Sequence, residues 1–129
     1  MTQNQEIQAL NKIVNSGLIL STYPNVDHID VSIHGVRQPY LIYKIYMKDE
    51  DITIEEVEDD IDVLWLIDHQ IMNVVSKLIP FEHLPLKSYD YQVIIYDGKG
   101  ISIFDWEHRL SQMKPGSTGK TDWERRQER

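Results

Sequence analysis

One dense acidic segment, from Asp49 to Asp62, carries the most distinctive chemistry of this sequence. Nine of its 14 residues are Asp or Glu, and none is Lys or Arg. Clustered carboxylates attract basic protein surfaces and repel nucleic-acid phosphates. The segment lacks the glycine of an EF-hand loop, so calcium binding is not predicted. We interpret it as either a solvated face or a surface that binds a basic partner. The residues assigned to that surface are Asp49, Glu50, Asp51, Glu55, Glu58, Asp59 and Asp62.

Asp68 has the side chain and the surroundings that acid–base catalysis would need. It lies within the most apolar segment of the chain, Val63 to Ile79. A carboxylate buried there must be paired or hydrogen-bonded, or its pKa rises. A structural carboxylate at the edge of an apolar stripe is the favoured interpretation, and a catalytic acid or base and a partner contact are the alternatives. The partners predicted on the facing sheet are Tyr43, Lys44, Tyr46 and Tyr91.

His28, Asp30 and His34 suggest a metal site, but all three fall on one predicted strand. Six residues at roughly 3.3 Å each place the two histidines about 20 Å apart, too far for one ion with bonds near 2 Å. A site at His28 and Asp30 would need further ligands from elsewhere in the chain, such as His69, Glu82 or His83. We therefore predict polar residues on a solvated sheet face, with no metal and no cofactor.

The segment from Lys114 to Thr121 approximates the phosphate-binding pattern G-x-x-x-x-G-K-[ST]. Lys114 replaces the first glycine, and only eight residues follow Thr121. A phosphate-binding loop must connect a buried strand to a helix, because backbone N–H groups and the helix N-terminus hold the phosphates. Residues 107–113 are not strand-like. We predict a linker that does not bind nucleotide.

Length and composition indicate a single globular domain. A chain of 129 residues can bury roughly two-thirds of the surface that it exposes when unfolded. The absence of cysteine excludes disulfides and thiol catalysis, and it fits a reducing compartment. The first residues show no signal peptide, and polar residues interrupt the longest near-apolar stretch, residues 61–79. We expect a cytoplasmic protein that does not enter a membrane.

Periodicity places the predicted elements in the first half of the chain. Apolar residues at helical spacing predict a helix over residues 3–16, with Gly17 as its C-cap. Residues 18–23 are β-prone and form a candidate edge strand. Alternation from Val26 to His34 predicts a half-buried strand, and residues 40–48 predict a second strand that pairs with it.

Thr53 and Glu56 form a T-x-x-E capping box, so one long helix is predicted from Ile54 until Pro80 ends it. Residues 89–96 and 101–106 predict two strands joined by the turn sequence Asp-Gly-Lys-Gly. The expected fold is α+β, a two-layer arrangement of an antiparallel sheet of two hairpins with the long helix packed on it. The domain should span residues 1–111.

The C-terminal residues differ from the body in charge and composition. Residues 1–106 hold 7 Lys or Arg against 17 Asp or Glu, whereas residues 107–129 hold 6 against 4. Residues 112–120 read as a polar linker, and a short docking helix is predicted after it. Trp and Arg dominate interface energetics, so Trp123, Arg125 and Arg126 are further candidates for partner binding or for a homodimer contact. Packing of Trp123 back onto its own domain is the alternative.

Three functional hypotheses follow from these features, and none assigns a catalytic residue. The first is a small acidic interaction protein, an inhibitor or immunity-type protein that blocks a basic partner surface and does not contact nucleic acid directly. The second is a chaperone or adaptor that holds a partner segment. The third is a small enzyme or ligand-binding domain with its site near Asp68. The expectation is that the protein is not an enzyme.

Overall fold

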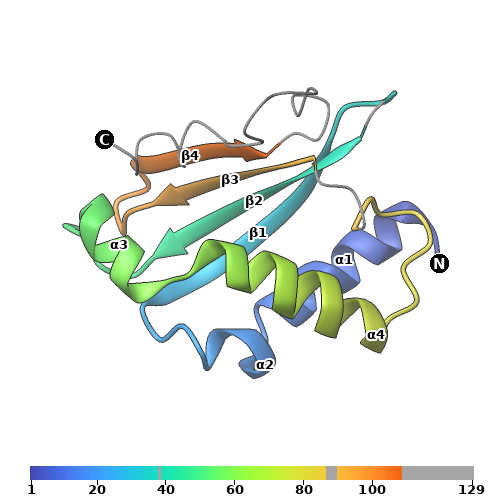
Figure 1. Ribbon diagram of the computed structural model, residues 1–129, viewed down its shortest axis with the longest axis horizontal. Coiled ribbons are helices and arrows are strands. Elements are labelled where there is room, and N and C mark those ends of the chain that lie inside the picture. The colour runs from blue at the N-terminus through green and yellow to red at the C-terminus, as the bar shows by residue number, and fades with distance from the viewer. Residues whose placement is uncertain (38, 87–89, 109–129) are drawn as a thin grey trace, which may run out of the picture.

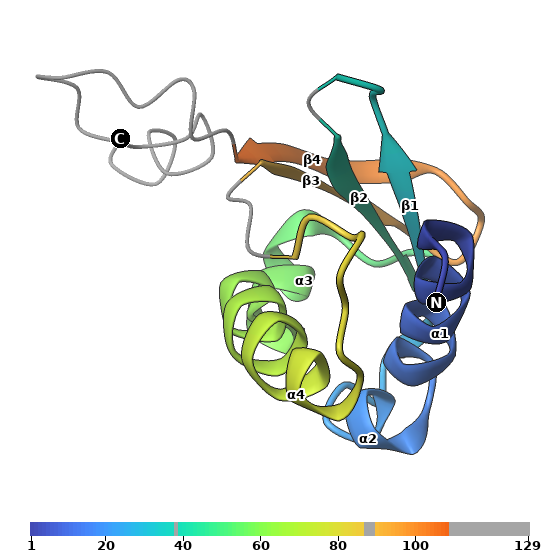
Figure 2. The same cartoon turned by 90° about the vertical axis from the view of Figure 1, so that its right-hand side faces the viewer.

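The computed structural model describes residues 1–37, 39–86 and 90–108, excluding the side chains of Asp59, Asp60 and His108. The protein is α+β, as predicted, and its helices cover one face of a four-stranded sheet (Figures 1 and 2). The elements in chain order are α1 (Gln3–Val14), α2 (Gly17–Leu20), β1 (Val26–His34), β2 (Tyr40–Met47), α3 (Ile54–Asp60), the π-helix η1 (Trp65–Val75), α4 (Ser76–Leu78), β3 (Tyr91–Tyr96) and β4 (Ser102–His108).

The sheet is mixed, so the prediction of an entirely antiparallel sheet is wrong. Its order is β1-β2-β3-β4, and the β1–β2 and β3–β4 pairs are antiparallel. The central pair is parallel, with Tyr43 opposite Val93. The helical segment between β2 and β3 returns the chain to the end of the sheet where β2 began, which is the connection that parallel neighbours require. The sequence interpretation overlooked this β-helix-β unit.

The proposed edge strand at residues 18–23 is also wrong. Gly17–Leu20 forms the short helix α2, and Gly17 begins this helix instead of capping α1. The edge of β1 is covered by α1. The amide of Asn11 donates to the carbonyl of Val31 and its Oδ1 accepts from the Val31 N–H, both at 2.8 Å. Asn15 makes the same pair of bonds with Ile29, both at 2.7 Å. These side chains satisfy backbone groups that an open edge would leave available for aggregation.

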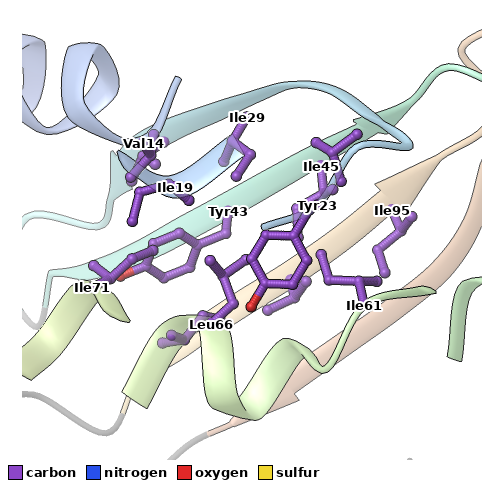
Figure 3. Close-up of a cluster of buried hydrophobic side chains, with 14 of the residues drawn as sticks. Val14, Ile19, Tyr23, Ile29, Tyr43, Ile45, Ile61, Leu66, Ile71 and Ile95 are labelled. Atoms are coloured by element: carbon purple, nitrogen blue, oxygen red, sulfur yellow. The ribbon is translucent and has the colours of Figure 1, made fainter. Parts of the chain in front are cut away.

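The core lies between the inner sheet face and the helices. Alternate residues of β2 and β3 point inward, and so do Ile29 and Val31 of β1, so Ile29, Tyr43 and Ile95 are almost fully buried. Figure 3 shows these side chains meeting Leu66 and Ile71 of η1 and Ile61 of the segment before it. The opposite sheet face is not covered by any helix in the described ranges (Figure 2).

The single long helix predicted from Ile54 to Ile79 is wrong, although its capping box is confirmed. The Thr53 side chain accepts from the Glu56 N–H and Glu56 accepts from the Thr53 N–H. Helix α3 then ends at Asp60, and Ile61 is extended with φ −140° and ψ 122°. Helix resumes at Val63, and the Asp62 carboxylate accepts from the Trp65 N–H at 3.0 Å.

The second helix is mostly a π-helix. Its buried residues are Leu66, Ile67, Ile71 and Val75, at spacings of four and five. The i→i+5 bonds of a π-helix bring residues at those spacings to one face. Within the described ranges, no helix combines the length and apolar character needed to cross a membrane.

Candidate functional site

The acidic segment begins in a turn held against the tip of the β3–β4 connection. The Gly98 N–H donates to the Asp49 carbonyl at 2.8 Å, and Lys99 Nζ lies 3.3 Å from Asp51 Oδ1. A Cβ on Gly98 would lie 2.5 Å from the Lys48 carbonyl oxygen, so only glycine allows this approach. The start of the acidic segment therefore has a fixed position relative to the sheet.

Helix α3 presents carboxylates outward and apolar side chains inward. Val57 is buried, whereas the side chains of Glu55, Glu56 and Glu58 are exposed. Glu55 and Glu56 occupy the first turn, where negative charge complements the helix dipole. Glu58 lies past that turn, so the dipole does not account for it.

A cavity of about 410 Å³ opens beside α3, and two carboxylates of the acidic segment belong to its wall. Those carboxylates are Glu58 and Asp62. The remaining lining is apolar or aromatic and comes from α3, the break after it, the start of the next helix, β3 and β4, as follows: Ile54, Val57, Ile61, Val63, Leu64, Ile95, Phe104 and Trp106. We call this cavity, with its two carboxylates, the acid-rimmed pocket.

The break between α3 and η1 forms one wall of the acid-rimmed pocket. Ile61 is extended and turns into the core beside Ile95 (Figure 3), while Asp62 stays exposed. Asp62 also lies close enough to Tyr23 to affect its ionisation. Burial raises the pKa of the Tyr23 hydroxyl, and the negative charge of Asp62 raises it further. Tyr23 therefore remains neutral beside the carboxylate at ordinary pH.

The acidic residues predicted to bind a partner divide into two groups. Glu58 and Asp62 line the acid-rimmed pocket. The others with described side chains are exposed but do not line it, namely Asp49, Glu50, Asp51 and Glu55. The side chain of Asp59, and all of Trp123, Arg125 and Arg126, lie outside the described part of the chain. Sequence reasoning missed the apolar wall, because Phe104 and Trp106 read as ordinary core residues.

Of the four sheet residues predicted as partners of Asp68, only Tyr43 and Tyr91 lie on the inner sheet face. The charge of Asp68 contributes to the environment of Tyr43 on the inner sheet face, as does Tyr91. Lys44 and Tyr46 belong to the alternate set of β2 residues, which points to the opposite face, so the prediction that they pair with Asp68 is wrong. Burial raises the pKa of Tyr43 well above its usual range, and Tyr91 and Asp68 add to that rise. A phenol held neutral in this way is a poor general base.

The histidines of β1 make local contacts. His28 Nδ1 lies 2.7 Å from an Asp27 carboxylate oxygen, and its ring stacks on Tyr46 at 4.4 Å. Tyr46 stacks in turn on Tyr96 at 4.7 Å, so three rings cross the outer sheet face. His34 contacts Tyr40 instead. In the ranges that the structure describes, no three His, Asp or Glu side chains gather to hold a metal ion.

A buried carboxylate that sequence reasoning missed is Glu6, which is 1% exposed. It accepts from the N–H groups of Glu82 at 2.7 Å and His83 at 2.9 Å, and it lies 2.6 Å from His83 Nδ1. Burial alone raises the pKa of Glu6, but the bonds from His83, Glu82 and Leu84 outweigh it, so the net pKa is lowered. This cluster joins α1 to the segment after α4 and has a structural role. Glu6 lies between Gln5 and Ile7, and its charged side chain gave no indication of burial in the sequence.

No protein-family model, curated protein or solved structure matches this chain. The functional proposal therefore depends on the arrangement described above. Its central feature is a cavity in which two carboxylates of the acidic segment meet an apolar wall.

Proposed function

We propose that this protein is a small acidic inhibitor, of the immunity or antagonist type, that blocks a basic surface of a partner protein. The acid-rimmed pocket supports the proposal, because it places Glu58 and Asp62 beside an apolar cavity. The matching ligand is a protein segment that presents Lys or Arg next to one apolar side chain. The proposed contact residues outside the pocket are Asp49, Glu50, Asp51, Glu55 and Asp59.

Charge supplies the selectivity and the rate of encounter in this proposal. The chain carries a formal charge of −8, and the acidic segment concentrates nine carboxylates on it. Complementary charge steers basic partners toward the site and disfavours acidic ones. It adds little affinity, since exposed ion pairs contribute only about 0.2–1 kcal/mol each.

The apolar wall supplies most of the affinity. Fully burying one Leu, Phe or Met side chain stabilises a complex by about 1.5–3 kcal/mol, more than an exposed ion pair contributes. The cavity volume of about 410 Å³ lies in the usual range for ligand pockets. A partner that lacks an apolar side chain between its basic residues should therefore bind weakly even at low salt.

A chaperone or adaptor would use the same pocket in a different way. Affinity would then come from apolar burial alone and would be the same at low and high salt, whereas the charge contribution to inhibitor binding would be lost as salt screens the exposed carboxylates. Salt dependence therefore separates the two functions.

The proposal can be tested with fluorescein-labelled synthetic peptides and fluorescence anisotropy. One peptide is rich in Lys and Arg with a central Leu, a second replaces the Leu with Ser, and a third replaces the basic residues with Glu. The first should bind saturably and weaken as salt increases. Binding of all three with similar affinity, or of none, would refute the proposal.

A matched pair of variants locates the site. Glu58→Gln with Asp62→Asn removes two charges from the pocket, and the Asn side chain can still accept from the Trp65 N–H. Asp27→Asn with Asp30→Asn removes two exposed charges of β1, outside both the acidic segment and the pocket. The pocket variant should lose about 0.4–2 kcal/mol, or about 2- to 30-fold in Kd, and the control much less. Equal losses would show that net charge governs binding and would exclude the pocket as the site.

A further inference from the structure

We propose that the acid-rimmed pocket has an intrinsic ligand, namely the chain's own C-terminal segment, residues 109–129, which enters it through Trp123. This inference rests on the proposed function in that both assign a basic, partly apolar ligand to the same pocket. It adds a form of regulation, because a partner must displace the C-terminal segment before it binds.

The C-terminal segment and the rest of the chain carry opposite net charges. Residues 109–129 hold 6 Lys or Arg against 3 Asp or Glu, a net charge of +3, while residues 1–108 hold 7 against 18, a net charge of −11. Trp123 is followed by Arg125 and Arg126. This combination of one large apolar side chain and neighbouring cations is the chemistry that the pocket favours.

The described part of the chain ends close to the pocket. Phe104 and Trp106 of β4 form part of the pocket wall, and the described chain ends at residue 108, two residues beyond Trp106. Trp123 follows 15 residues later. Fully extended, that length reaches up to about 50 Å, and a flexible chain of that length has an end-to-end distance of about 20 Å. Both lengths allow Trp123 to reach the pocket, whose residue Trp106 lies shortly before the segment in the sequence.

Because the C-terminal segment is covalently joined to the domain, even a weak affinity is enough for it to occupy the pocket. A ligand joined by a short flexible linker has an effective concentration in the millimolar range. An indole buries a large apolar area when it enters a cavity, and a volume of about 410 Å³ leaves room for it. A segment with submillimolar intrinsic affinity would then occupy the pocket in most molecules.

Paramagnetic relaxation in the full chain tests the inference, because a spin label can be placed uniquely. The sequence has no cysteine, so Gln127→Cys provides the only thiol. Amides of Val63, Leu64 and Ile95 at the pocket should broaden, and those of α1, at the far end of the molecule in Figure 1, should not. Trp123→Ala, and separately Glu58→Gln with Asp62→Asn, should remove most of the broadening, while the β1 control Asp27→Asn with Asp30→Asn should retain it.

Three results would overturn the inference. The first is broadening that is unchanged by Trp123→Ala, which is what an undocked segment near the pocket would produce. The second is no broadening at all. The third is broadening only when labelled protein is mixed with isotope-enriched unlabelled protein, which would place the segment on a second copy.

Peptide binding separates this inference from the proposed function. In the full chain, Trp123→Ala should tighten binding of the Lys/Arg/Leu peptide by about tenfold, since an intrinsic competitor has been removed. Peptide binding without intramolecular broadening would refute the C-terminal ligand and leave the proposed function standing. Broadening that depends on Trp123, with no peptide binding even in Trp123→Ala, would support the C-terminal ligand and refute the proposed function.

Discussion

The Glu6 cluster should make stability depend on pH in a defined direction. Glu6 is buried and accepts hydrogen bonds from the backbone of Glu82 and His83 and from the His83 ring. Glu6→Ala removes the acceptor and leaves the backbone N–H groups of Glu82 and His83 without it. Each unsatisfied buried donor costs about 1–3 kcal/mol, and partial exposure of the segment lowers that cost. We expect a loss of about 2–4 kcal/mol in the free energy of unfolding.

Glu6→Gln isolates the contribution of charge. The amide oxygen of Gln can still accept from both backbone N–H groups, so we expect a smaller loss of about 1–2 kcal/mol. The pKa of Glu6 is lowered in the folded protein from an ordinary value of 4.5. The charge therefore stabilises the fold fully at pH above 4.5, and this contribution disappears as pH falls through the lower folded-state pKa.

Urea unfolding at neutral pH and at acidic pH, for wild type and both variants, measures these differences. The difference between wild type and Glu6→Gln should shrink on acidification, and the exposed control Glu50→Gln should show no such change. A Glu6→Gln protein as stable as wild type at neutral pH would refute the assignment of a stabilising charge. A difference that grows as pH falls would show that the pKa of Glu6 is shifted in the other direction.

Three further changes test the scaffold. Gly98→Ala should lower the melting temperature markedly, because its Cβ would lie 2.5 Å from the Lys48 carbonyl oxygen. Gly17→Ala is the control and should not lower it, because no atom lies near its Cβ. Equal melting temperatures of the two variants would refute the close approach. Tyr43→Phe should leave stability unchanged or raise it, because the buried hydroxyl has no hydrogen-bond partner in the described residues; a loss above about 1 kcal/mol in urea unfolding would reveal a partner. Asn11→Ala should lose about 1–3 kcal/mol and increase aggregation in light scattering, because it uncovers the edge of β1, and unchanged values of both would contradict that role.

Local signals in the sequence predicted the elements where local chemistry decides them. The helix predicted over residues 3–16 is α1, Gln3–Val14, and the Thr53–Glu56 capping box begins α3 as expected. Strand alternation was reliable because one face of each strand is buried and the other is not. The capping box and the alternation involve residues at most a few positions apart, so they can be detected in a single sequence.

The parallel pairing and the helix break depend on contacts between distant residues. Nothing near Tyr43 indicates that Val93 lies beside it in parallel, because that pairing follows from the path of the whole connection. The apolar spacing from Ile54 onward also fits a continuous α-helix. The π-helix differs from it only in that the buried residues from Leu66 to Val75 recur at spacings of four and five. The pocket wall was unpredictable for the same reason, since it brings α3 against β3 and β4.

The acidic residues of α3 and Asp62 favour the helix break between them. Carboxylates stabilise the first turn of a helix and destabilise the last, and like charges four residues apart repel. Helix α3 is acidic from Glu55 through its last residue, Asp60, so its charge increasingly opposes its continuation. Asp62 follows the break, where its carboxylate accepts from the Trp65 N–H and favours the start of a new helix. The residues proposed to attract a basic partner thus also favour the end of one helix and the start of the next, and the pocket that would receive that partner opens at this junction.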